Sequence, residues 1–249
     1  MAMSPTLPNS DLSFMRLALD LAAGARGYVW PNPPVGCVIV REGAILAEAA
    51  THPGGRPHAE RKALDKAGDG ATGATLYVTL EPCCHWGKTP PCVDAIIAAG
   101  ISRVVCAIQD PDPRVNGGGF DRLRGAGVDL TIGLGADKAS AVMSGFFHRI
   151  RTGIPELVIG DVDFGMIPDG VDAVLRSSKI GLILETRTRM QNCTHKSTDA
   201  VMRWMGTRGL TTVAVPTKDL FLQRLHLSIG NSSGPRPSDL SKQPRGIGV

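Results

Sequence analysis

The sequence predicts an α/β protein with a mixed sheet covered by helices on both faces, followed by a smaller α/β region. A β-hairpin pattern opens the first half of the chain, and helix and strand patterns then alternate to about residue 150. The run at 103–108 is apolar after its first residue, as expected of a strand buried on both faces. The chain has 249 residues, 43% of them hydrophobic and 20% charged, which is enough to bury a core without disulfides.

The first elements are a helix and a hairpin. The polar residues at 9–11 offer helix caps, and Met15, Ala18, Leu19 and Ala22 follow at helical spacing. The hairpin joins two β-rich runs, 35–40 and 44–50, through a Glu-Gly turn at 42–43.

The later elements of the first half are bounded by proline and glycine. A helix over 58–67 ends at Gly68, and a helix over 92–99 begins after two prolines and stops at Gly100. The remaining predicted elements are strands at 74–80, 103–109 and 128–132, a short helix at 120–124 and a last helix at 136–151.

The periodicity weakens near residue 152, which suggests a boundary between two parts of the chain. Residues 1–11 are predicted to be a flexible N-terminus, 12–152 a first domain, 153–230 a second region and 231–249 a disordered tail rich in Ser, Pro and Gly. In the second region, strands are predicted at 157–159, 180–184 and 211–215, and a helix at 200–205.

Composition excludes several classes of function. A net charge of +4 and an aromatic content of 4% fit an anionic small molecule and argue against nucleic acid. No apolar run reaches the roughly 18 residues of a membrane span, and the N-terminus lacks the pattern of a secretory signal, so we expect a cytoplasmic protein with no membrane partner.

A histidine, a glutamate and clustered cysteines carry the strongest chemical signal. His58 and Glu60 stand two residues apart at a predicted helix start, and three of the six cysteines lie at 83, 84 and 92. One imidazole and two thiolates suit tetrahedral Zn²⁺ with an open fourth position, where a bound water has a pKa near about 7. Glu60 could then carry the proton of that water to a leaving amine, as in zinc-dependent deaminases.

Two matters stay open at this point. Cys83 and Cys84 are adjacent, and spacing does not say which of them is a ligand. The competing interpretation is a structural zinc site, or core cysteines beside a capping glutamate. Cys37 and Cys106 lie inside apolar strands and are expected to be inert core thiols.

Residues 12–152 resemble the deaminase domain of the bifunctional riboflavin-biosynthesis deaminase/reductase (RibD/RibG) family. The nine-residue spacing between Cys83 and Cys92 separates this family from ordinary cytidine and tRNA adenosine deaminases, which have Pro-Cys-x-x-Cys. The matching segments are PNPPVGCVIV (31–40), PHAE (57–60), YVTLEPC (77–83), GKTPPC (87–92), QDPDP (109–113) and RTG (151–153).

The resemblance implies a cytidine-deaminase-like three-layer α/β/α fold and a role for each matched residue. Zn²⁺ is the implied cofactor, with His58, Cys83 and Cys92 as its ligands and Glu60 as the proton carrier. The implied substrate is 2,5-diamino-6-(5-phosphoribosylamino)pyrimidin-4(3H)-one, which loses an exocyclic amine by hydrolysis. Substrate contacts are expected from Asn32 at the pyrimidine and from His52, His85 and Lys88 at the ribose phosphate. Trp30 and Asp112 differ from the residues common in the family.

The second region departs from the family. Its members continue into an NADPH-dependent reductase domain, whereas 97 residues follow Thr152 here, and the lysine-containing strand and the Ser-Leu-Asp-Gly turn are missing. Residues 174–190 resemble a reductase helix and strand, and 204–222 resemble the segment before a Gly-Gly nucleotide-binding turn, which VAVPTK (213–218) replaces. We therefore expect a reductase remnant that binds no NADPH.

Three hypotheses follow for the function. The first is a riboflavin-type deaminase, a homo-oligomer as in the family, whose product is used by a separate reductase. The second is a deaminase of the same chemistry acting on a related pyrimidine in a specialised pathway. The third is a zinc-stabilised paralogue without activity, against which the intact Glu60 argues.

Overall fold

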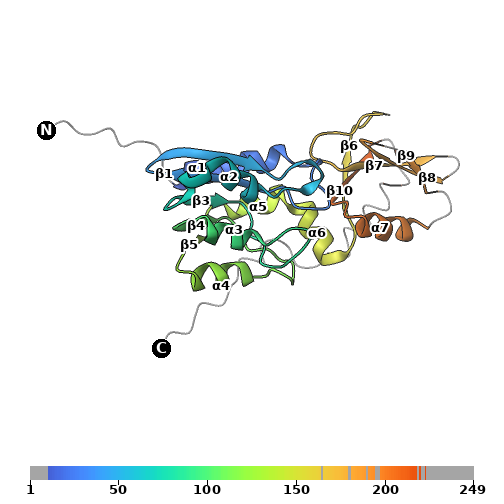
Figure 1. Ribbon diagram of the computed structural model, residues 1–249. Coiled ribbons are helices and arrows are strands. Elements are labelled where there is room, and N and C mark those ends of the chain that lie inside the picture. The colour runs from blue at the N-terminus through green and yellow to red at the C-terminus, as the bar shows by residue number, and fades with distance from the viewer. Residues whose placement is uncertain are drawn as a thin grey trace, which may run out of the picture.

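The computed structural model describes residues 11–163, 165–178, 181–188, 190–193, 197–217, 219 and 222. Two sheets organise these residues, one for each part of the chain that the sequence predicts, and they stand side by side in Figure 1. The predicted flexible N-terminus, 1–11, and the predicted tail, 231–249, lie outside the described part except for residue 11. No described helix is long and apolar enough to cross a membrane.

The first sheet has the strand order β2-β1-β3-β4-β5. Strands β1 (Gly36–Arg41) and β2 (Ala44–Ala50) form the predicted hairpin, and β1 also pairs antiparallel with β3 (Thr75–Val78). Strands β4 (Arg103–Cys106) and β5 (Asp129–Ile132) continue the sheet in parallel with β3. The mixed sheet is therefore confirmed.

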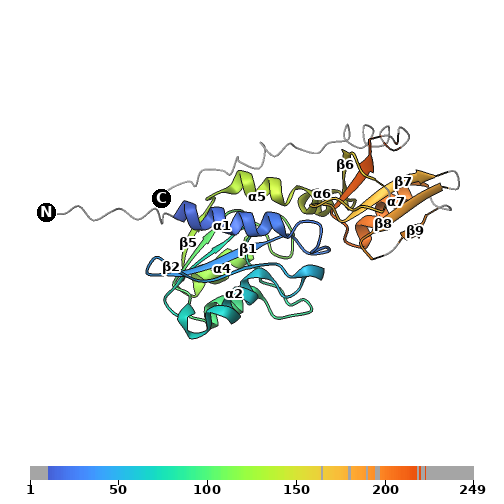
Figure 2. The same ribbon diagram turned by 90° about the horizontal axis from the view of Figure 1, so that it is seen from above.

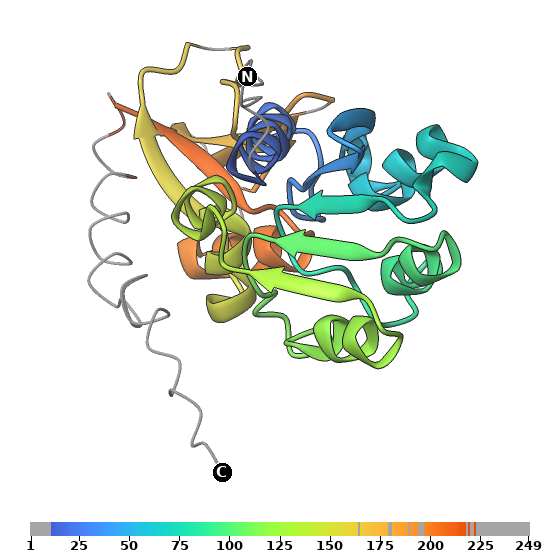
Figure 3. The same cartoon turned by 90° about the vertical axis from the view of Figure 1, so that its left-hand side faces the viewer.

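Helices cover both faces of this sheet, as Figures 2 and 3 show. Helices α1 (Asp11–Gly24) and α5 (Ala136–Val142) lie together on one face. The other face carries α2 (Ala59–Ala67), α3 (Cys92–Ala98) and α4 (Gly118–Gly125). Apolar side chains such as Met15, Ile39 and Leu76 fill the layers between them and are fully buried. This is the predicted three-layer α/β/α arrangement.

The predicted helix over 136–151 is in fact two helices, α5 and α6 (Ser144–Thr152). Met143 between them leaves the helical region at φ −104° and ψ 14°. The break allows α5 to pack on α1 while α6 packs on the second sheet at β6 (Glu156–Gly160). Sequence periodicity alone could not show it, because both halves keep a helical pattern.

The second sheet has the order β6-β10-β7-β8-β9. Strand β10 (Thr212–Pro216) runs parallel to β6 and β7 (Ala173–Ser178), and β8 (Gly181–Thr186) and β9 (Met190–Asn192) extend the sheet antiparallel. Helix α7 (Thr198–Thr207) packs its buried Val201, Met202 and Met205 into this domain's core. The smaller α/β region is confirmed.

Of the helix and strand expected over 174–190, the strand is present as β8, whereas the helix is wrong, because β7 stands in its place and pairs antiparallel with β8. Strands β7 and β9 were not predicted. Strand β7 has only three consecutive apolar residues, Ala173 to Leu175, and one of its two partners, β10, lies far along the chain.

The carboxyl ends of β3 and β4 meet at one edge of the first sheet. The segment 79–91 leaves β3 there, and the segment 107–117 leaves β4 beside it, joined by a hydrogen bond from the Glu81 amide to the Ile108 carbonyl. The starts of α2 and α3 face the same edge, because His58 and Cys92 there lie against Cys83 in segment 79–91. This edge holds the candidate site, as is general in sheets with parallel strands.

Candidate active site

His58, Cys83 and Cys92 come together although they lie on three different segments. His58 immediately precedes α2, Cys92 opens α3, and Cys83 lies in the loop after β3. The Nδ1 atom of His58 is 3.7 Å from the Cys83 sulfur and 3.4 Å from the Cys92 sulfur. All three ligand atoms lie within 4.8 Å of one another.

The geometry of this triad fits zinc. Zn–N bonds of about 2.1 Å and Zn–S bonds of about 2.3 Å at a tetrahedral angle place nitrogen and sulfur roughly 3.6 Å apart. The two measured N–S distances bracket that value. Three protein ligands leave one tetrahedral position free, which is typical of a catalytic site and not of a structural one.

The protein environment prepares one of the two thiols for deprotonation. The pKa of Cys83 is lowered to about 4, chiefly by the hydrogen bond from the Cys92 side chain and also by His58 and the Cys92 backbone amide, 3.3 Å from the sulfur. The Cys92 thiol that donates this bond has its pKa raised. The hydrogen bond to Cys83 also raises the pKa of His58. A metal cation would displace the remaining protons.

Cys84 takes no part in the triad. Its sulfur turns away and donates a weak hydrogen bond to the Arg114 carbonyl at 3.6 Å. The structure thus decides between the two adjacent cysteines, which spacing alone did not. Cys37 and Cys106 are fully buried in the core of the first domain, as predicted.

Glu60 and Asn32 stand beside the triad. Glu60 lies in the first turn of α2 and is only 4% exposed, and this burial raises the pKa of its carboxyl group. The side-chain amide nitrogen of Asn32 donates to the Gly55 carbonyl at 2.6 Å and lies 3.1 Å from His58 Nε2. This close contact between Asn32 and Gly55 requires a glycine, because a Cβ at position 55 would lie 2.9 Å from the Asn32 side chain.

A cavity of about 470 Å³ opens over these residues. Of the predicted substrate contacts, Asn32, His85 and Lys88 line it together with Glu60. The Nδ1 atom of His85 is buried and has no hydrogen-bond partner within the described part of the chain. His52 does not line the cavity: its side chain is exposed and Nδ1 lies 2.8 Å from the Pro53 carbonyl.

Several cavity residues were missed by sequence reasoning. Asp110 and Arg114 come from the loop after β4, which also carries Asp112, already noted as a departure from the family; Arg56 comes from the segment before α2, and Arg149 from α6. The motif at 109–113 contains Asp110 and Asp112, but it did not by itself indicate a chemical role for them. Arg114 pairs with Asp112 through its Nε and Nη2 atoms, so one of the departures from the family takes part in the cavity wall. The other, Trp30, packs against the second core instead.

Glu81 holds the loop after β4 in place. It is 3% exposed, and its two carboxylate oxygens accept backbone hydrogen bonds at 2.8–3.1 Å from Asp110, Gly117 and Gly119. The carboxylate therefore ties the cavity loop to the start of α4. Burial raises the pKa of the neighbouring Asp110 carboxyl to about 7.

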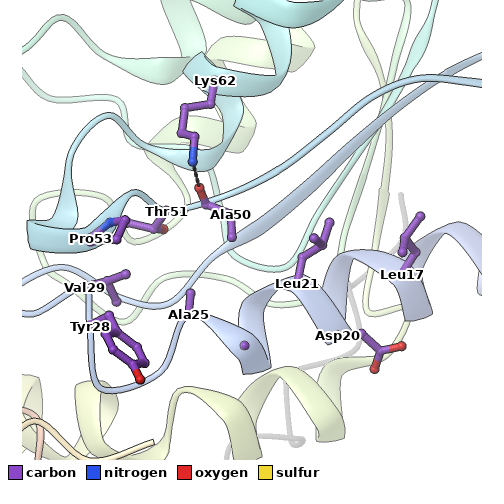
Figure 4. Close-up of a pocket in the computed structure, with 11 residues that line it drawn as sticks. Leu17, Asp20, Leu21, Ala25, Tyr28, Val29, Ala50, Thr51, Pro53 and Lys62 are labelled. Atoms are coloured by element: carbon purple, nitrogen blue, oxygen red, sulfur yellow. Dashed lines mark hydrogen bonds between the residues drawn. The ribbon is translucent and has the colours of Figure 1, made fainter. Parts of the chain in front are cut away.

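A second hollow, of about 580 Å³, lies between α1, the end of β2 and α2 (Figure 4). Its lining includes Leu17, Leu21, Tyr28 and Lys62, and the Lys62 amine donates to the Ala50 carbonyl at 3.0 Å. It is the larger of the two hollows, but no histidine or cysteine lines it. The metal-ligand triad thus marks the other cavity as the candidate active site.

Comparison with known proteins agrees with this geometry. Residues 8–108 match the family described as the cytidine and deoxycytidylate deaminase zinc-binding region. A diaminohydroxyphosphoribosylamino-pyrimidine deaminase of Buchnera aphidicola is 46% identical over 145 residues, which is 58% of this chain and 99% of that protein. The chain belongs to the diaminohydroxyphosphoribosylamino-pyrimidine deaminase family.

Longer relatives of this deaminase family share only part of their length with the chain. The riboflavin biosynthesis protein RibD of Escherichia coli is 52% identical over 145 residues, or 58% of this chain and 40% of that protein. RibD of Aquifex aeolicus is 39% identical over 213 residues, or 84% of this chain and 59% of that protein. The chain therefore spans about two to three fifths of the length of these RibD relatives.

A solved structure extends the likeness beyond the deaminase part. RibD of Acinetobacter baumannii superposes with a TM-score of 0.69 and 26% identity, covering 87% of this chain and 84% of that one. Residues 12–152 are less than three fifths of the chain, so this coverage must include the second sheet.

Proposed function

We propose that the protein hydrolytically deaminates 2,5-diamino-6-(5-phosphoribosylamino)pyrimidin-4(3H)-one. One observation carries the proposal: the buried Glu60 lines the same cavity as His58 and Cys83, which with Cys92 form a triad of zinc-binding dimensions. The substrate follows from the family and from the name of the Buchnera relative.

His58, Cys83 and Cys92 are the residues that would hold zinc. When bound there, zinc would supply a water acidic enough to ionise near neutral pH. Glu60 accepts one proton of the attacking water and delivers it to the ring nitrogen, and it then carries the second proton, from the hydroxyl group now on the carbon, to the exocyclic amine. A carbon–oxygen bond forms, the carbon–nitrogen bond breaks, ammonia leaves and a carbonyl remains.

The remaining cavity residues orient the substrate. The hydrogen bond to the Gly55 carbonyl holds the Asn32 side chain close to His58, so its amide can form hydrogen bonds with one edge of a pyrimidine. His85 and Lys88 line the same cavity from the loop before α3 and suit the ribose-phosphate end. The exposed His52 is less well placed for this role.

The test is ammonia release from this pyrimidine by zinc-loaded protein, beside Glu60→Gln. We expect release that falls by at least about 10³-fold in Glu60→Gln while zinc content stays at one ion per chain. Release only from a related pyrimidine would favour a specialised pathway, for which the Asp112–Arg114 pair in the cavity wall is the supporting observation. No release from any such pyrimidine by a zinc-loaded protein would leave the inactive paralogue.

We further propose that residues 153–230 form a reductase-like domain without NADPH activity. The likeness to Acinetobacter RibD supports its origin, and VAVPTK at 213–218 lacks the glycines that let a backbone approach a dinucleotide phosphate. Binding of NADPH at micromolar concentrations would contradict this. The homo-oligomer, the separate reductase and the cytoplasmic location stay predictions, the first testable by light scattering.

A further inference from the structure

Arg149 reaches the candidate active site from outside the segments that carry the motifs. It lies on α6 and lines the same cavity as His58 and Cys83. Its Nη2 atom donates to the Pro31 carbonyl at 3.0 Å, next to Asn32, and its guanidinium carbon lies 5.5 Å from the centre of the Phe146 ring. Both contacts fix the direction of the side chain.

The Arg149 guanidinium group has an unused hydrogen-bond donor and no ion-pair partner among the described residues. Its Nε atom is buried without a hydrogen-bond partner in the part of the chain that the structure describes. Among the same residues, no carboxylate oxygen lies within 4.0 Å of its nitrogens. Asp112, which lines the same cavity, is already paired with Arg114.

The Asp172 and Asp112 carboxylates favour the charge of the half-buried Arg149 from a distance, but among the described residues neither forms an ion pair with it. Burial lowers its pKa below the ordinary value, yet an arginine keeps its charge. A buried charge with an unused donor is stabilised strongly by a bound anion, which supplies both the countercharge and the acceptor. The planar fork of arginine suits the oxygens of a phosphate in particular.

The second sheet holds α6 where this arginine is needed. A Cβ on Gly145 of α6 would lie 2.1 Å from the Thr212 hydroxyl of β10, so the helix backbone is in direct contact with that strand. Gly209, which follows α7, approaches Pro31 equally closely on the side of the second domain. Pro31 is thus contacted by both Arg149 and Gly209.

We propose that Arg149 is a binding residue for the anionic phosphate end of the substrate, presented to the cavity by a helix that the second sheet fixes in place. The proposal rests on the proposed deaminase function for the identity of the substrate. It also gives the second sheet a structural role, holding α6 in place, that requires no bound nucleotide.

The test compares Arg149→Met with Arg149→Lys and with Arg151→Met, an exposed arginine on the same helix. Ammonia release is measured with the phosphorylated substrate and with its dephosphorylated riboside. We expect Arg149→Met to raise KM for the phosphorylated substrate about 10- to 100-fold with a much smaller change in kcat. The riboside should change less than about 3-fold, Arg149→Lys should recover part of the loss, and Arg151→Met should match the wild type.

A binding measurement keeps this test separate from the deaminase proposal. Titration calorimetry with ribose 5-phosphate should show binding to the wild type and to Arg151→Met, and a loss of about 10-fold or more in Arg149→Met. That result supports the role of Arg149 even if no pyrimidine is deaminated. Equal loss for the phosphorylated substrate and the riboside, or ribose 5-phosphate binding that Arg149→Met leaves unchanged, overturns it.

Discussion

Replacing Glu81 with glutamine tests how the cavity loop is held. The carboxylate accepts the amides of Asp110 and Gly117 on one oxygen, at 3.1 and 3.0 Å, and the amide of Gly119 on the other, at 2.8 Å. Glutamine keeps one oxygen but presents an NH₂ group in place of the second. Two backbone donors then lose their acceptor, either Asp110 and Gly117 or Gly119 and Phe120, whose amide lies 3.4 Å from the second oxygen.

The expected cost of this change follows from those bonds. Two buried amides left unsatisfied cost about 3 kcal/mol together, which for a chain of this size lowers Tm by roughly 6–12 °C. Differential scanning calorimetry measures it, with the exposed Glu48→Gln as a matched control that should shift Tm by less than about 1 °C. KM should rise as well, because the released loop carries Asp112 and Arg114. A Glu81→Gln protein as stable as the control would refute the reasoning.

Three further predictions concern the metal, the pH and the packing of α7 against the end of α6. Cys83→Ser should lose zinc in a stoichiometry assay while Cys84→Ser keeps it, because only Cys83 lies within ligand distance of His58; equal zinc content in both would refute the assigned ligand. Because burial raises the folded-state pKa of Asp110 to about 7 from an ordinary 3.8, the stabilising effect of its protonated form is present below about pH 4 and is lost as the pH rises to 7. Asp110→Asn should therefore gain stability relative to the wild type between pH 5 and pH 8 in urea titrations, and a difference independent of pH would contradict this. Gly206→Ala should destabilise the folded protein by about 2 kcal/mol or more in thermal melts, because a Cβ there would lie 1.8 Å from the Gly153 carbonyl. The control is Gly125→Ala, at a helical glycine with open space around it, which should be neutral or slightly stabilising in the same melts.

The sequence alone could determine the features that local patterns encode. Alternating and helical periodicity predicted the hairpin of β1 and β2 and the helices of the first domain, because burial of one face imposes a regular spacing on apolar residues. The pairing of His58 with Cys92 and the nearby Glu60 were also predictable, because zinc ligands must be of few residue types.

The tertiary structure alone decided what depends on residues distant in the chain. Cys83 and Cys84 are equivalent by spacing, and although the family resemblance implied Cys83, the physical distinction comes from the folded loop, which turns one sulfur to His58 and the other to Arg114. Strand β7 was missed because its partners β8 and β10 supply the pairing that its short apolar run does not. Arg149 has no motif, since its place in the cavity comes from the packing of α6 on β10. Periodicity and metal chemistry are local properties of the sequence, whereas the walls of a cavity are made by contacts between segments that the sequence keeps apart.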